Sequence, residues 1–259
     1  MKEFGIWIRK TAFLIISILL GLALWQSFTR FSNIPSFIFP SPSDVWTKFL
    51  VVMQNGSLIY HTFITLQEVV SGLLLGLTTA IITGYLLAKS PLVEQVLSPY
   101  IVASQSIPIV AIAPLLVIWL GPGIFSKVLT SALIVFFPVL VNTIVGLRSV
   151  PAELYDLMKS LQATTVQRIT KLEIPAALPV FLGGLRIGAT LAVIGAVVGE
   201  FVGADKGLGF LVNVGRGLYD TALVFVAVFT LVFLALALYG SVVFLESRLL
   251  AWQKRNGDQ

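Results

Sequence analysis

Six long apolar runs occupy most of this chain, and they limit its possible folds more than any other feature. A helix needs about 20 apolar residues to cross the hydrocarbon core of a bilayer, where its backbone must satisfy its own hydrogen bonds. Six segments reach that length: 11–29, 61–87, 100–120, 127–146, 181–202 and 222–245. Only 11% of the residues are charged, against about 25% in soluble domains. The sequence predicts an all-α membrane protein with about six transmembrane helices in one domain, residues 1–259.

The join after the first apolar run predicts a helix at the membrane surface. Three prolines between residues 35 and 42 interrupt any continuous helix there. The stretch that follows has the amphipathic spacing of a short helix over 44–54, with Ser43 or Asp44 as its N-cap. A short amphipathic helix beside a span is expected to lie in the interface rather than cross it.

The distribution of Lys and Arg predicts the orientation, because cytoplasmic loops carry the excess of positive charge. Placing both termini in the cytoplasm puts twelve of the 17 basic residues inside. The segment 150–178, between the fourth and fifth spans, is then cytoplasmic as well. The net charge of +5 reflects this topology. Because the basic residues form no continuous stripe, no nucleic-acid partner is expected.

The sequence lacks the motifs of nucleotide-binding and catalytic sites. A Walker A loop requires G-x-x-x-x-G-K-[ST], and GPGIFSK and GADKGLG both fail that spacing. The absence of cysteine and the single histidine exclude thiolate and His-rich metal sites. We therefore expect neither enzymatic activity nor a cofactor bound by this chain. A secondary carrier needs charges near the midplane of its spans, and no charged residue of this sequence falls at an obvious midplane, so that class is disfavoured as well.

Polar groups within the third to fifth spans are candidates for lining a solute pathway. Pro108 and Pro114 predict a kinked third span with exposed backbone carbonyls. The candidate pathway residues are Ser104, Gln105, Ser106, Asn142 and Glu200. The alternative is that the hydroxyls bond to their own helix and that Asn142 joins two helices.

Small residues recur at intervals of four along the fifth span and predict close helix packing. The candidates are Gly184, Gly188, Gly195 and Gly199. Their face can pack inside one copy of the chain or form a homodimer contact. The glycine-rich stretch 200–220 after this span is expected to be an outside loop, either plain or a docking surface for an external partner.

The most polar long segment of the chain is YDLMKSLQATTVQRITKLEIPAALP, residues 155–179. Asp156, Lys159, Ala163 and Gln167 share one face of a helix, and apolar residues lie mainly on another. Such a helix can lie on lipid or insert into the groove of a protein partner. The mixed charge of its polar face favours the protein partner, because lipid-surface helices are more cationic.

This segment is similar in spacing to the motif E-A-A-x3-G-x9-I-x-L-P. Asp156 takes the acidic place, Leu157 and Met158 the alanines, and Gln162 the glycine, and the last three places are taken by Leu172, Ile174 and Pro175. In this the chain resembles the permease subunits of bacterial ABC importers. IPIVAIAPLLVIWLGPG and the ending FLESRLLAW resemble the branch that imports nitrate, sulfonates, taurine, bicarbonate and small vitamin-type heterocycles.

The resemblance implies a multi-pass protein of the bacterial inner membrane that works with partners. A permease homodimer would form the pathway, an external binding protein would deliver the solute, and a separate subunit would bind ATP and magnesium. The contact with that ATP-binding subunit is assigned to Asp156, Leu157, Met158, Lys159, Gln162, Ala163, Leu172, Ile174 and Pro175.

The solute itself is chosen on a weaker observation. The spans show no positive midplane charge, which favours a neutral heterocycle such as riboflavin or a pyrimidine precursor of thiamine over an anion. Sulfonate, taurine or nitrate is the alternative solute. A secondary carrier or a non-transporting membrane scaffold is the alternative class.

Overall fold

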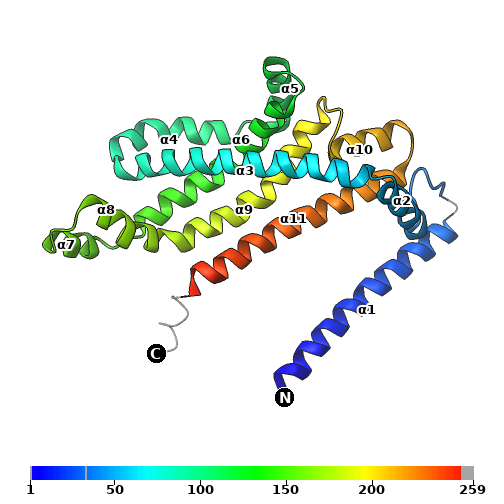
Figure 1. The fold of residues 1–259 in the computed structure, drawn as a ribbon, viewed down its shortest axis with the longest axis horizontal. Helices are drawn as coiled ribbons and strands as arrows, with labels where there is room; N and C mark the ends of the chain where they lie inside the picture. The colour runs from blue at the N-terminus through cyan, green and yellow to red at the C-terminus, as the bar shows by residue number, and fades with distance from the viewer. Residues whose placement is uncertain (1, 33, 252–259) are drawn as a thin grey trace.

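The structure is a computed structural model that describes residues 2–32 and 34–251. This part of the chain is built from helices joined by short turns (Figure 1). In chain order they are α1 Lys2–Phe31, α2 Pro42–Gln54, α3 Ser57–Lys89, α4 Pro91–Gln105, α5 Ile109–Leu120, α6 Ile124–Arg148, α7 Ala152–Ser160, α8 Thr165–Arg168, the π-helix η1 Ile169–Glu173, α9 Ile174–Phe201, α10 Leu208–Gly217 and α11 Thr221–Leu249.

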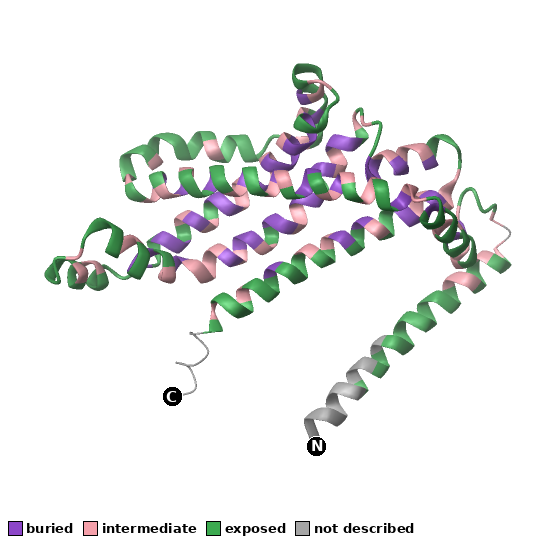
Figure 2. Ribbon diagram, viewed as in Figure 1, coloured by how far each residue is buried: buried purple, intermediate pink, exposed green. Residues whose placement is uncertain are grey.

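The centre of the bundle is α6, which packs against both α3 and α9. Small residues allow these helices to approach closely. A Cβ on Gly76 of α3 would lie 2.7 Å from the carbonyl oxygen of Ala132 in α6. Buried residues line this seam (Figure 2), among them Val69, Ala80, Val135, Val139, Ala192 and Ala196. Apolar side chains outside the seam are widely exposed, as expected where lipid is the solvent.

Four helical stretches of the described chain are long and apolar enough to cross a membrane. They are α3, α6, the continuous stretch Thr165–Phe201 and α11, and they coincide with the predicted second, fourth, fifth and sixth spans. The predicted first span lies within α1, whose apolar part, Ile15–Phe31, is shorter. With α4 and α5 counted as one further span the number reaches five. The expected six spans stay a prediction.

The predicted third span, residues 100–120, is not one helix. It is divided between α4 and α5, whose axes meet at 93°. Pro108 is the N-cap of α5. Proline has no N–H to donate and disfavours helical geometry in the residue before it, so the helix ends at that point. The sequence predicts a kink at Pro108, and the structure has a complete break.

The surface helix α2 begins earlier than predicted. Its N-cap is Ser41, not Ser43 or Asp44. Ser41 Oγ accepts a hydrogen bond from Asp44 N (3.2 Å), and Ser41 N donates to Asp44 Oδ2 (3.0 Å). Asp44 therefore serves as the third helical residue of a capping box. Pro42 fits at the first helical position because the N–H it lacks would be unbonded there.

The helix α1 stands away from the central bundle and runs back toward the side where α7 lies (Figure 1). Trp25 joins it to the rest of the chain. Its indole nitrogen donates to Pro40 O (3.1 Å), and its ring centroid lies 5.4 Å from that of Phe225 in α11. The start of α1 and the end of α11 lie toward the same side of the bundle as α7. We call that side the α7 end and the opposite side the α10 end.

Candidate functional site

The segment between α6 and α9 projects from the bundle at the α7 end (Figure 1). The helix α7 contains no buried residue. Its apolar side chains are exposed all the same: Leu157 is 52% exposed, and Leu161, at the C-cap, is 67% exposed. Apolar side chains on a helix that no other element covers indicate a surface for a partner.

The helix α7 has an inner face toward the bundle and an outer face that is exposed. Tyr155 and Met158, three residues apart, are partly buried and face the bundle. Among the residues assigned to the partner contact, Asp156, Leu157 and Lys159 are exposed on the outer side. Met158 is therefore the one assigned residue of α7 that lies on its inner side.

The end of α7 is closed by a Schellman motif. Gln162 N donates to Lys159 O (3.0 Å), and Ala163 N donates to Met158 O (2.9 Å). This geometry places Gln162 in the left-handed region, with φ of 53°. The motif E-A-A-x3-G-x9-I-x-L-P has glycine at the corresponding place, and glycine adopts that conformation without steric cost. Gln162 is exposed, and Ala163 is partly buried.

Replacing Gln162 by glycine should stabilise the end of α7. The substitution removes the strain of a side chain in the left-handed region, about 1 kcal/mol. We expect the amide protons of residues 162 and 163 to exchange about fivefold more slowly in Gln162→Gly. Hydrogen exchange with mass spectrometry measures this. Gln162→Ala is the matched control, since it truncates the side chain without relieving the strain; equal slowing in both variants would contradict the explanation.

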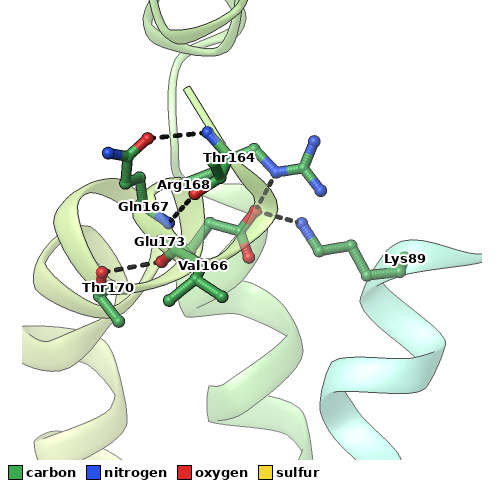
Figure 3. Close-up of polar contacts among 7 residues, drawn as sticks. All are labelled: Lys89, Thr164, Val166, Gln167, Arg168, Thr170 and Glu173. Atoms are coloured by element: carbon green, nitrogen blue, oxygen red, sulfur yellow. Dashed lines mark hydrogen bonds and ion pairs between the residues drawn. The ribbon is translucent and has the colours of Figure 1, made fainter. Parts of the chain in front are cut away.

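After α7 the chain returns to the bundle through α8, which has its own capping box. Thr164 N donates to Gln167 Oε1 (2.8 Å), and Gln167 N donates to Thr164 Oγ1 (3.3 Å) (Figure 3). The helix then widens into the π-helical turn η1. Turns of this kind are rare in proteins, and those that occur are often found at functional sites. Of the assigned residues beyond this point, Leu172 is buried, Pro175 is partly buried and Ile174 is 52% exposed.

The widened turn carries a buried carboxylate that sequence reasoning missed. The side chain of Glu173 is 0% exposed, and its Oε1 lies 2.6 Å from Lys89 Nζ and 3.2 Å from Arg168 Nε (Figure 3). A buried carboxylate requires such partners. The only signal in the sequence is an acidic residue set between Leu172 and Ile174, two apolar neighbours.

The candidate pathway residues do not form one cluster. Ser104 and Ser106 donate to the carbonyls of Tyr100 (2.7 Å) and Val102 (3.3 Å), in the last turn of their own helix. Both are exposed at the break between α4 and α5, as is Gln105. Asn142 Nδ2 donates to Pro138 O within α6 (2.8 Å). No hydrogen bond joins these groups to one another within residues 34–251.

Glu200 lies at the α10 end, buried at the base of α10. Its Oε1 accepts a hydrogen bond from Thr65 Oγ1 (2.6 Å), and its Oε2 accepts one from Gly209 N. Leu208 N donates to Thr65 Oγ1 (2.8 Å), and Gly207 N donates to His61 Nδ1 (2.9 Å). Side chains of α3 and α9 thus cap the first turn of α10.

The stretch 200–220 was expected to be a loop, and that expectation is wrong for its second half. Residues 208–217 form α10, with Leu208, Leu211 and Val212 buried. Two of the glycines that suggest a loop, Gly207 and Gly209, instead make room for Glu200: a Cβ on Gly207 would lie 2.1 Å from Glu200 Oε1. Sequence reasoning missed His61 and Thr65 because their partners lie more than a hundred residues away.

The four candidate glycines of α9 contact α6 of the same chain. A Cβ on Gly195 would lie 2.5 Å from Ser131 Cα, and one on Gly184 would lie 2.6 Å from Asn142 Cβ. Gly188 faces Val139, and Gly199 faces Lys127. Ser131 Oγ adds a hydrogen bond to Ala192 O (3.0 Å). Close approach of α6 and α9 is therefore the local role of this face.

The chain is a bundle of apolar helices, and between two of its spans it carries an exposed helix with a surface for a partner. These features define a class of protein: a multi-pass membrane component that works in a complex. This chain belongs to the family of binding-protein-dependent transport system inner membrane components, which matches residues 72–251. The family places the chain in the inner membrane.

Relatives of known name support the same assignment. The riboflavin transport system permease protein RibX of Chloroflexus aurantiacus is 45% identical over 92% of this chain and 89% of its own length. The formylaminopyrimidine transport permease protein ThiX of Halalkalibacterium halodurans is 36% identical over 92% and 94%. The aliphatic sulfonates transport permease protein SsuC of Bacillus subtilis, a putative assignment, is 31% identical over 90% and 84%.

A solved structure shares the fold. A chain of the MetNI methionine ABC transporter, in an inward-facing conformation, superposes with a TM-score of 0.66 and 18% identity. The match covers 76% of this chain and 97% of that one. Together with the family, this identifies the chain as a permease component of an ABC importer.

Proposed function

We propose that this permease moves a neutral heterocycle of the riboflavin or pyrimidine-precursor type. The observation that carries the proposal is the 45% identity with a riboflavin permease, which exceeds the 31% identity with the sulfonate permease. The charges inside the spans agree with it. Arg186 is paired with Glu246, and Lys127 Nζ donates to the carbonyls of Pro122 and Gly123. Both cations thus have partners within this chain.

The proposed complex has four kinds of contact. Two copies of this chain, each a single membrane domain, would enclose the pathway, with the exposed stretch Ser104–Ser106 facing it. The α10 end would receive the external binding protein. At the α7 end, on the cytoplasmic side, the outer face of α7 would enter a groove of the ATP-binding subunit, which holds ATP and magnesium. Lipid would cover the remaining apolar surface.

The physical support for the α7 contact is its shape and exposure. A short helix that lies outside the bundle, closed at its C-terminal end by hydrogen bonds, is a stiff element for a groove. Movement of two ATP-binding subunits would displace it as a rigid body and so bias a permease dimer between two arrangements. The low exposure of Leu172 and Pro175 indicates that these two residues support the segment and do not meet the partner.

Uptake into proteoliposomes tests the choice of solute. The complex of this chain with its ATP-binding subunit is reconstituted, and the binding protein is added with labelled riboflavin, formylaminopyrimidine or taurine. We expect ATP-dependent accumulation of one of the two heterocycles and none of taurine. Accumulation of taurine alone would overturn the proposed solute class. Uptake driven by a proton gradient without the ATP-binding subunit would overturn the assignment to an ATP-driven importer.

A further inference from the structure

The ion cluster at the base of the projecting segment joins three elements that are distant in sequence. Lys89 is the last residue of α3, Arg168 is the last residue of α8, and Glu173 is the last residue before α9. Their charged groups meet at Glu173 Oε1 (Figure 3). The carboxylate itself is buried, while the side chains of Lys89 and Arg168 are 33% and 41% exposed. The cluster therefore lies at the surface of the bundle with its acidic member inside.

Lys89 extends this cluster to α7. Its Nζ lies 5.3 Å from the centre of the Tyr155 ring in α7 and 5.5 Å from the centre of the Tyr85 ring in α3. An ammonium group is attracted to the face of an aromatic ring at such distances. Lys89 thus makes an ion pair with the base of α9 and a cation–π contact with the inner side of α7.

We propose that Glu173, Lys89, Arg168 and Tyr155 form a joint that transmits displacement of α7 to α3 and α9. Because α7 buries none of its residues, the contacts of its inner face and its chain connections carry its coupling to the bundle. Tyr155 contacts Lys89, and Lys89 is both the last residue of α3 and the ion-pair partner of the carboxylate before α9. A displacement of α7 therefore reaches both helices through Lys89. These are positioning residues, and the proposal rests on the proposed docking of α7.

The physical character of the cluster suits this role. An ion pair whose acidic member is excluded from water is costly to separate, because an unpaired buried charge is strongly disfavoured. The joint is therefore stiff, and Lys89 and Glu173 move together. Glu173 itself lies in the π-helical turn η1, between α8 and α9.

The substitution Glu173→Gln tests the joint, because it removes the charge and keeps the shape. The complete transporter is reconstituted, and two quantities are measured. One is the retention of the ATP-binding subunit, and the other is the increase in ATP hydrolysis when the binding protein is added in the form in which it is purified. We expect retention within about twofold of the original chain and stimulation reduced by about tenfold. This readout does not depend on which solute is carried.

Two sets of variants separate transmission from folding. Glu94→Gln removes a different ion pair, with Arg148, between α4 and α6, and should leave stimulation within about twofold. Tyr155→Leu should reduce stimulation as Glu173→Gln does, while Tyr155→Phe, which keeps the ring, should restore it. If Glu173→Gln does not fold, the two variants of the partly buried Tyr155 still decide the question.

Two results would overturn the joint. One is unchanged stimulation in Glu173→Gln or Tyr155→Leu. The other is a loss of basal and stimulated hydrolysis in equal proportion, which is what a merely structural role predicts. Failure of the underlying docking proposal looks different: Asp156→Arg would then leave the ATP-binding subunit bound as tightly as before.

Discussion

Replacing Asp156 by arginine should release the ATP-binding subunit from this permease. Asp156 is exposed on the outer face of α7, the face that we propose enters the partner. Reversing its charge leaves an unmatched cation in a desolvated contact, which costs about 2 kcal/mol or more at the centre of an interface. The dissociation constant should therefore rise by about 30-fold or more. Binding of the purified ATP-binding subunit to the permease in detergent measures the change.

The control for this experiment is Asp205→Arg. Asp205 is exposed and lies between α9 and α10, at the opposite end of the bundle. The same charge reversal there should leave the affinity for the ATP-binding subunit unchanged within about twofold. Equal affinity in the Asp156 variant and the original chain would remove α7 as the point of contact, and equal weakening by both variants would point to net charge as the cause.

Adding a single methyl group at Gly195 should destabilise the bundle strongly. The new Cβ would lie 2.5 Å from Ser131 Cα and 3.1 Å from Ser131 N. These are backbone atoms, which cannot rotate away, so α6 and α9 would have to separate. Overpacking of this kind costs about 1–3 kcal/mol and sometimes more. We expect the apparent Tm of Gly195→Ala in detergent to fall by about 5–10 °C, with a lower yield of monodisperse protein.

Gly183 provides a matched control on the same helix. A Cβ there meets nothing within 4 Å in this chain. Gly183→Ala should keep the original Tm or raise it slightly, because alanine is the better helix former. If Gly195→Ala were as stable as Gly183→Ala, α6 and α9 would lie further apart in the membrane than in this structure.

Much of the fold can be predicted from local patterns. The second, fourth, fifth and sixth apolar runs became helices long enough to span a membrane, because hydrophobicity and helix length are properties of the run itself. The third run broke at Pro108 more completely than expected. The extent of a break depends on how the two halves pack, and the proline alone decides only where it falls. The helix α10 was missed because its glycines resemble those of a loop.

The candidate site stays a prediction, and its interior was missed. The spacing from Asp156 to Pro175 predicts a distinct segment, and the structure has a short exposed helix, α7, in that stretch. The left-handed φ of Gln162 gives a physical reason for the glycine of the motif. Glu173 was not assigned to the site, because one charged residue between apolar neighbours does not reveal its partner.

The sequence by itself determined the class of this protein, its division into apolar helices and its family. These follow from composition, periodicity and motif spacing, which each segment carries locally. Only the tertiary structure decided which charges meet. Lys89 and Glu173 are 84 residues apart, and Thr65 and Glu200 are 135 residues apart. Such pairs depend on where helices cross, and the crossing of α3, α6 and α9 is set by the joint packing of their small residues, which no single segment encodes.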